Sequence, residues 1–271
     1  MSEKLCPWSL KDVAKVFLLY ILMIGVGCPL ILSLLERISS ETTTMHTSNS
    51  ILILTLFMNA AVCLYIFYIV SRRCSTSGRI GFTLLGSGVL TSLGLSLKNW
   101  KRYLSEGLLL YFLALPLLLG AGWLVEYVTR ALHGIPQHQE VVTRFMEEKS
   151  TGVLTFMLFF AALFGPFTEE LLFRGFLQPA LREIVGAWKA VLLSALLFSF
   201  VHLNIYVFLQ IFLLGLILAY LFEKTGTLIA PIFVHMLHNT ATLTFILSNK
   251  QFVTKIGQSA DLFGGQGTLL G

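Results

Sequence analysis

The sequence Glu-Glu-Leu-Leu-Phe-Arg occupies positions 169–174, at the end of an apolar run that begins at Thr151. Each ionised side chain at membrane depth costs about 2.5–3.5 kcal/mol on insertion scales. Two carboxylates and a guanidinium at such a position therefore predict either a functional site or partners that neutralise them. The fold is expected to be organised around this stretch, with other polar groups brought to the same depth.

The composition is that of a membrane protein. The chain has 271 residues, of which 56% are hydrophobic and 12% are charged, and the charged share is about half that of an average soluble protein. Lipid is the expected solvent for most of such a chain, so the expected fold is an all-α polytopic bundle. The net charge of +5 fits lysines and arginines on cytoplasmic loops, and no nucleic-acid partner is predicted.

Apolar runs close to the length that a helix needs to cross a bilayer, about 20 residues, recur along the chain. They cover Val16–Leu35, Ile51–Val70, Gly107–Val125, Thr151–Leu181, Ala187–His202, Tyr206–Phe222 and Thr227–Leu247. About seven transmembrane helices are therefore expected, or eight if Ile80–Leu97 also crosses. Basic groups at both ends of Ile80–Leu97 favour a re-entrant or surface-lying segment on the cytoplasmic side.

The helices are expected to form one structural domain with three parts. N-terminal helices and loops occupy residues 1–150, a core occupies 151–247, and a Gly-rich tail occupies 248–271. Lysines and arginines gather in the loops of one side, which the positive-inside rule identifies as the cytoplasm. We therefore expect a multi-pass protein of the cell (inner) membrane with a cytoplasmic N-terminus.

The charged stretch divides into two parts on a helix. Residues four apart share a helix face, so Arg174 can neutralise Glu170, and a structural role is predicted for this pair. Glu169 is turned about 100° away and has no local cation. A lone carboxylate in such surroundings is a candidate general base.

A second polar element, Phe-Ser-Phe-Val-His, ends at His202. Glu169 lies nearly as many residues before the turn at Gly186 as His202 lies after it. Two straight helices leaving that turn would bring both side chains to about the same depth. A lone histidine near a helix end is usually an interfacial residue, but the depth match makes His202 a candidate for catalysis.

A third polar element in the last apolar run contains His235, His238 and Asn239. His235 and Asn239 share a helix face, from which both can donate hydrogen bonds to a developing oxyanion. The alternative is an interhelical polar clamp worth about 1 kcal/mol, which is the expected role of His238. A straight-helix count places His235 nearer the cytoplasm than His202, so helix tilt or a break near Asn204 must close the gap.

Together, the three elements resemble the CAAX-protease and bacteriocin-processing family of intramembrane glutamic endopeptidases, which includes the Rce1-type prenyl protease. That family has the patterns EExxxR, FxxxH and HxxxN on successive membrane helices. Here they are complete and in order, as Glu169-Glu170-x-x-x-Arg174, Phe198-x-x-x-His202 and His235-x-x-x-Asn239. The resemblance covers about Thr151 to Leu247, and upstream only a general apolar pattern agrees.

The resemblance implies a fold, an activity and a role for each residue. It implies a helical bundle with a polar intramembrane cavity open towards the cytoplasmic side, no cofactor, and a peptide or protein tail at the membrane as substrate. The implied roles are water activation by Glu169 with His202, an oxyanion hole of His235 and Asn239, and support from Glu170 and Arg174. Eukaryotic members cleave prenylated CaaX tails and prokaryotic members are linked to peptide maturation or bacteriocin immunity, and the residues do not choose between these.

Two other interpretations stay open. The same glutamate and histidines could ligate zinc in a membrane metalloprotease, but the pattern HExxH is absent and a metal-free site is favoured. The polar groups could also only tie helices together or relay protons, in a non-catalytic scaffold or transport accessory protein. A hydrolase needs room for water and an extended peptide, whereas a scaffold does not.

Overall fold

The computed structural model describes residues 8–23, 44–76, 86–132 and 150–249, together with residues 30, 142, 145, 146 and 148. All regular structure in this part of the chain is helical. Five of its helices are long and apolar enough to cross a membrane, and they are Ile53–Ser75, Trp100–Ala131, Thr151–Val185, Ile205–Thr225 and Ile229–Ser248. The protein is therefore an all-α, multi-pass integral membrane protein, which confirms the predicted fold class.

The helices lie close to the predicted spans. They include α1 (Leu10–Leu22), α3 (Thr44–Thr76), α5 (Trp100–Ala131), α10 (Ala187–Phe200), α11 (Ile205–Thr225) and α12 (Ile229–Ser248). The apolar helix α10 is shorter than the five candidate spans, and α1 overlaps only the first part of the predicted span Val16–Leu35, the rest of which lies almost wholly outside the described residues. The predicted tail lies outside the described residues from position 250 onward.

The central helix runs from Thr151 to Val185 and changes its winding along its length. It consists of α7 (Thr151–Phe159), the π-helical η2 (Phe160–Phe164), α8 (Gly165–Glu170), the π-helical η3 (Leu171–Leu177) and α9 (Gln178–Val185). Each π segment precedes a proline in the first turn of the next helix, Pro166 or Pro179. Proline has no N–H and its ring crowds the carbonyl of the preceding turn, so that turn widens. The helix is therefore irregular on both sides of the two glutamates, and not straight as the depth argument assumed.

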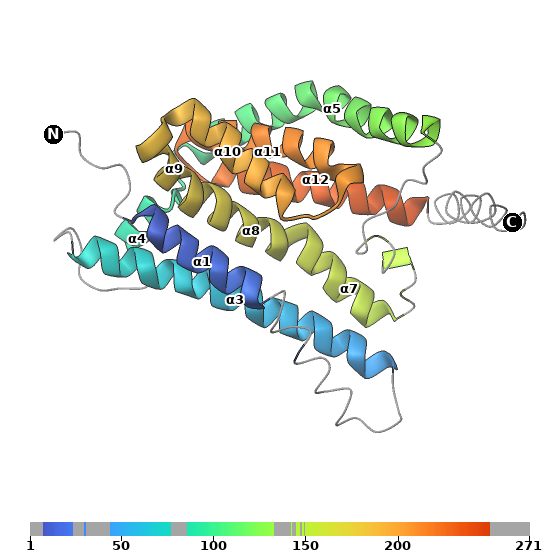
Figure 1. The fold of residues 1–271 in the computed structure, drawn as a ribbon, viewed down its shortest axis with the longest axis horizontal. Helices are drawn as coiled ribbons and strands as arrows, with labels where there is room; N and C mark the ends of the chain where they lie inside the picture. The colour runs from blue at the N-terminus through green and yellow to red at the C-terminus, as the bar shows by residue number, and fades with distance from the viewer. Residues whose placement is uncertain are drawn as a thin grey trace, which may run out of the picture.

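The central helix lies in the middle of the bundle, with α1 and α3 on one side and α10, α11 and α12 on the other (Figure 1). It runs alongside α11, and one polar contact joins the two helices at each of three successive turns. These contacts are Arg174 Nη2 to Gly215 O at 3.1 Å, Gln178 Nε2 to Ala219 O at 3.0 Å and Arg182 Nη1 to Glu223 Oε1 at 3.1 Å. The register between these two helices is therefore set by polar groups.

The main hydrophobic core joins the two predicted parts of the domain. It contains Val16 from α1 and Ile66 from α3 together with Phe176 from η3 and Phe198 from α10, all fully or almost fully buried. The N-terminal helices therefore pack directly against the helix that carries the charged stretch. The predicted boundary at residue 150 stays a prediction.

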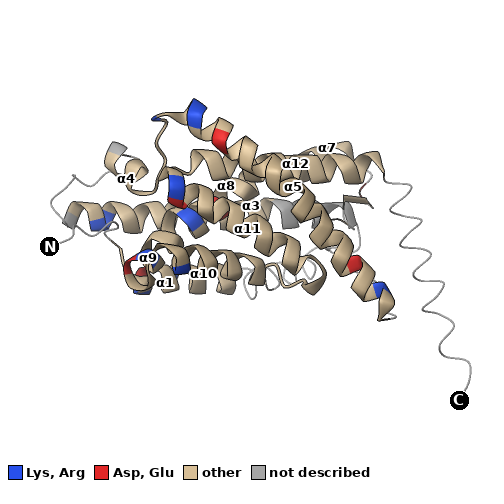
Figure 2. Cartoon of the chain, turned by 90° about the horizontal axis from the view of Figure 1, so that it is seen from above, with Lys and Arg blue, Asp and Glu red and all other residues tan. Residues whose placement is uncertain are grey.

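The segment predicted at Ile80–Leu97 forms, in its described part, only the short helix α4 (Ser87–Ser92) and the loop after it. Gly94 O accepts hydrogen bonds from Leu228 N at 2.8 Å and from Thr227 Oγ1 at 3.0 Å, which fixes this loop to the turn between α11 and α12. Figure 2 shows most of the charged residues gathered towards this end of the bundle. The described residues of the segment thus lie at one end of the bundle without forming a spanning helix, and the side that faces the cytoplasm stays a prediction.

Candidate active site

Glu170 and Arg174 form a fully buried ion pair on the central helix. Arg174 Nη1 lies 2.8 Å from Glu170 Oε1, and both side chains are 0% exposed. The guanidinium also donates to Gly215 O and lies over the ring of Phe198, 4.4 Å from its centroid. The structural pair predicted from the four-residue spacing is confirmed, and α10 and α11 hold its cation in addition.

His235 on α12 contacts both glutamates of the central helix. Its Nδ1 lies 2.8 Å from Glu170 Oε1, and its Nε2 lies 3.7 Å from Glu169 Oε2. The side chain of His235 is 4% exposed, so the first contact is a buried hydrogen bond. These contacts place His235 of α12 beside the two glutamates. Its polar contacts are thus with the glutamates and not with His202.

Glu169 differs from its neighbour by its accessibility. Its side chain is 30% exposed, whereas that of Glu170 is 0% exposed. Among the described residues, its ion pair is with His235 from α12, and no cation of the central helix forms an ion pair with it. Of the two adjacent carboxylates, only that of Glu169 is therefore open to a water or a substrate.

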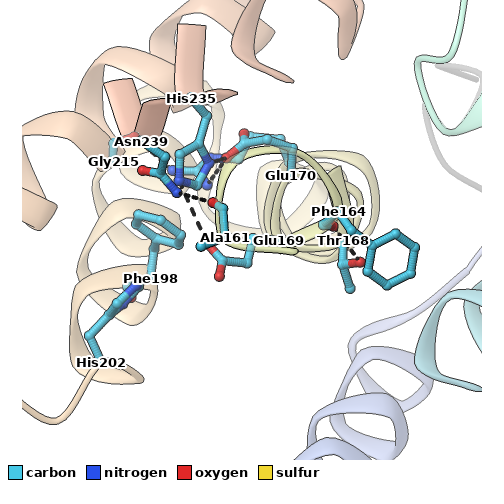
Figure 3. A network of polar contacts seen from close by, with 11 residues as sticks. Ala161, Phe164, Thr168, Glu169, Glu170, Phe198, His202, Gly215, His235 and Asn239 are labelled. Carbon is cyan, nitrogen blue, oxygen red and sulfur yellow. Dashed lines mark hydrogen bonds and ion pairs between the residues drawn. The ribbon is translucent and has the colours of Figure 1, made fainter. Parts of the chain in front are cut away.

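Asn239 is fixed to the π-helical segment η2. Its Nδ2 donates a hydrogen bond to Ala161 O at 2.9 Å. A carboxamide nitrogen has two hydrogens, so this bond leaves one of them and the amide oxygen for other partners. Figure 3 shows Asn239 and His235 directed from α12 towards the central helix, where Ala161 and Glu169 lie.

His202 lies one turn away from this cluster, on the other side of the Phe198 ring (Figure 3). Phe198 contacts the rings of both histidines edge to face, with centroids 5.0 Å from His202 and 5.7 Å from His235. Nδ1 of His202 lies 2.8 Å from Phe198 O, so Nδ1 carries a hydrogen, and Nε2 of the neutral ring is left as an acceptor. No hydrogen bond or ion pair between described residues joins His202 to Glu169.

Both α10 and the central helix contact α11 at Gly215. An added Cβ at Gly215 would lie 3.1 Å from the Phe198 ring and 3.3 Å from the Cα of Ala195, and Gly215 O accepts a hydrogen bond from Arg174 Nη2. Glu169 precedes Arg174 by just over one turn, and His202 follows Phe198 by one turn on a helix of opposite direction. The equal depth of Glu169 and His202 stays a prediction.

His238 forms an interhelical contact with α5. Its Nδ1 lies 3.3 Å from the hydroxyl of Tyr111, and the two rings meet edge to face at 6.0 Å. Tyr111 is 3% exposed. The pair ties α12 to α5, which is the role expected for His238.

A cavity of about 320 Å³ lies between the N-terminal part of the central helix, α7 and η2, and the C-terminal half of α12. It is lined by Leu158, Ala162, Thr240, Leu243, Thr244, Leu247 and Ser248. The hydroxyls of Thr240 and Thr244 donate to carbonyls of their own helix, so the lining is almost wholly apolar. The polar cavity expected around Glu169 stays a prediction.

Two features of the site could not be read from the sequence. The ring of Phe198 packs against both histidines and Arg174, although the FxxxH pattern only marked its position. The carbonyl of Ala161 holds Asn239, and the only signal for it was Pro166, whose effect depends on the π winding before it.

Comparison with known proteins identifies the segment that holds these residues. Residues 151–241 match the family model described as Type II CAAX prenyl endopeptidase Rce1-like. The chain is 32% identical over 84 residues to "Putative membrane peptidase YdiL" of Bacillus subtilis (strain 168), a match that covers 31% of this chain and 34% of the relative.

A second relative is "Membrane-embedded CAAX protease MroQ" of Staphylococcus aureus (strain USA300). It is 32% identical over 111 residues, covering 38% of this chain and 44% of the relative. The matches thus span less than half the length of either relative. No solved structure shows a significant match to the chain.

Proposed function

Because residues 151–241 match the Rce1-like CAAX protease family model, we propose that the protein is an intramembrane endopeptidase. It hydrolyses a peptide bond of a membrane-associated peptide or protein tail. The observation that carries this proposal is the convergence of α8 and α12. There, His235 contacts both glutamates while Glu169 alone keeps an exposed carboxylate.

In the proposed reaction, Glu169 and His202 activate water. The Glu169 carboxylate, helped by Nε2 of His202, accepts a proton from a water that attacks the scissile carbonyl. The carbonyl oxygen becomes an oxyanion, which accepts hydrogen bonds from His235 Nε2–H and the second Nδ2–H of Asn239. Collapse of the tetrahedral intermediate breaks the C–N bond, and the proton taken from water passes to the leaving amine.

The oxyanion role of His235 sets a condition on its protons. Its Nδ1 is engaged by Glu170, so only Nε2 can donate to the oxyanion, and it can do so only when both ring nitrogens carry hydrogen. With hydrogen on both nitrogens of His235, the formal charges of Glu169, Glu170, Arg174 and His235 sum to zero.

The metal-free route is proposed over the zinc alternative. Among the described residues, no group of three or more His, Cys, Asp or Glu side chains is placed to hold a metal ion. The two histidines of the site, His202 and His235, lie on opposite sides of the Phe198 ring. A chelator tests this choice, because complete loss of activity that zinc restores would contradict the metal-free route.

The scaffold alternative has its own observation, since Asn239, His238 and Arg174 all make interhelical bonds. Such bonds do not explain why Glu169 keeps an exposed carboxylate. The partly exposed carboxylate therefore supports the protease over the scaffold.

The test is cleavage of a defined probe by the purified protein in lipid nanodiscs. The probe is a fluorescence-quenched peptide ending in a CAAX sequence, in prenylated and unprenylated forms, because the matched family is described as a CAAX prenyl endopeptidase. We expect cleavage of at least one form, reduced about 10²–10⁴-fold in Glu169→Gln and substantially in His202→Ala. Which form is cut decides whether the substrate is prenylated.

A matched control is Glu126→Gln, which removes a half-exposed carboxylate from the far end of α5 and should leave cleavage unchanged. Full activity in Glu169→Gln, or no cleavage of either probe by the folded protein, would contradict the proposed function. The cytoplasmic N-terminus and inner-membrane location belong to the same proposal. Single cysteines are introduced into the N-terminal region of the protein, and intact cells are treated with a membrane-impermeant thiol reagent. A cytoplasmic N-terminus predicts that these cysteines are not labelled.

A further inference from the structure

Pro166 removes one hydrogen-bond donor from the central helix, three residues before Glu169. In η2 the backbone bonds span five residues, and Gly165 N–H donates to Phe160 O. The next bond in this series would join residue 166 to Ala161 O, but proline has no N–H. Ala161 O is therefore left without the backbone donor that the helix would otherwise supply.

Asn239 fills this position from another helix. Its Nδ2 donates to Ala161 O at 2.9 Å, which satisfies the carbonyl and fixes the plane of the carboxamide. One Nδ2 hydrogen makes this bond. Because the carboxamide is planar, the same bond also fixes the direction of the second Nδ2 hydrogen. A backbone carbonyl that Pro166 leaves without a helical donor thus sets the orientation of the Asn239 side chain from α12.

The segment around Pro166 is tied to α12 on both sides. Ala161 precedes Pro166 and binds Asn239, while Glu169 and Glu170 follow it and contact His235. His235 and Asn239 share one face of α12. Pro166 itself is buried in the helix and makes none of these contacts.

We propose that Pro166 is a positioning residue that acts through Ala161 and Asn239. By withholding an N–H it keeps the Ala161 carbonyl open for Asn239, and the carboxamide is held with its second N–H facing the reacting carbonyl. This inference rests on the proposed function, because it assigns a role in the same reaction. It concerns the backbone that orients the site and not the groups that touch the substrate.

The variant Pro166→Ala tests the inference, because it restores an N–H that competes for the freed carbonyl. We expect kcat for the CAAX peptide probe to fall about 10–100-fold while KM changes little, since misplacement by about 1 Å is costly in catalysis. The thermal midpoint should stay the same or rise, because alanine is favourable inside a helix and proline is not. A merely structural proline would show the opposite, with loss of stability and no separate loss of kcat.

A double-mutant cycle with Asn239→Ala tests the route. If Pro166 acts through Asn239, Pro166→Ala lowers kcat no further in an Asn239→Ala background. The matched control is Pro116→Ala, which makes the same change at an exposed position inside α5 and should leave kcat unchanged.

Unchanged kcat in Pro166→Ala, or fully additive losses in the double variant, would overturn this inference. Either result alongside an inactive Glu169→Gln would leave the proposed function standing. Full activity in Glu169→Gln would instead contradict the proposed chemistry, whatever Pro166→Ala does.

Discussion

Glu169 and Glu170 carry the same side chain on adjacent residues, and their surroundings give them different tasks. Glu170 is sealed between Arg174 and His235, whereas Glu169 keeps 30% of its side chain exposed. A carboxylate that is buried and paired in this way can support its neighbours, but it has no access to solvent. The division of labour between two neighbouring acids is therefore set by which helix face each one occupies.

The buried pair leads to a prediction on stability. Arg174→Ala should destabilise the protein by about 3–5 kcal/mol, because Glu170 would remain buried without its main cation. Glu169→Gln should cost less, because the Glu169 side chain is partly exposed and its contact with His235 is 3.7 Å long. Thermal unfolding of both variants in the same detergent provides the comparison. Equal stabilities, or a milder loss for Arg174→Ala, would contradict the structural role of the pair.

At the scale of elements, side chains at helix ends fix where helices begin and which neighbours they meet. Asp12, which precedes the first apolar run, accepts a hydrogen bond from Ser9 N at 2.9 Å at the start of α1. Arg73 Nη2 lies 2.8 Å from the same carboxyl group, which joins the start of α1 to the end of α3. One acid therefore serves both as a helix cap and as a tie between two helices.

Burial raises the pKa of the Asp12 carboxyl, but hydrogen bonds from Arg73 and Ser9 outweigh this effect and hold the pKa below its usual value. A lowered folded-state pKa contributes stability above the unfolded-state pKa, about 3.9, and the contribution is lost as pH falls through the folded-state value. Asp12→Asn should therefore cost about 1 kcal/mol at pH 7, and the difference from wild type should shrink below about pH 4.

Thermal unfolding at neutral and acidic pH measures this difference. The half-exposed pair of Glu126 and Arg130 offers a control, because Glu126→Gln should change stability little at either pH. A difference for Asp12→Asn that grows as the pH falls would contradict the assigned cause.

At the scale of the whole molecule, close helix packing places the site. Gly215 on α11 faces α10, where an added Cβ would lie 3.1 Å from the Phe198 ring and 3.3 Å from the Cα of Ala195. The same residue offers its carbonyl to Arg174. Three helices therefore meet at one glycine, and the distance between His202 and the glutamates depends on how closely they approach.

Gly215→Leu should force α10 and α11 apart and displace Phe198. We expect a loss of about 1–3 kcal/mol in stability, as for other overpacked positions, together with reduced cleavage of the CAAX peptide probe. Gly120→Leu is the control, because nothing lies within 4 Å of a Cβ at that position. Wild-type stability and cleavage in Gly215→Leu would show that the close approach is not required.

The sequence alone determined the membrane class, the approximate positions of the described helices and the pairing of Glu170 with Arg174. These follow from local rules, because hydropathy selects spans and a four-residue spacing selects a helix face. The resemblance of residues 151–241 to the Rce1-like family was likewise recognisable from three short patterns in order.

Only the tertiary structure decided which groups touch. It joined His235 to both glutamates, placed Phe198 between the two histidines, and gave Asn239 a partner in Ala161. These contacts depend on how α12 packs against the central helix and on the π winding before Pro166, which rotates side chains relative to a regular α-helix. Such rotations arise from packing between helices distant in sequence, so no pattern within one helix contains them.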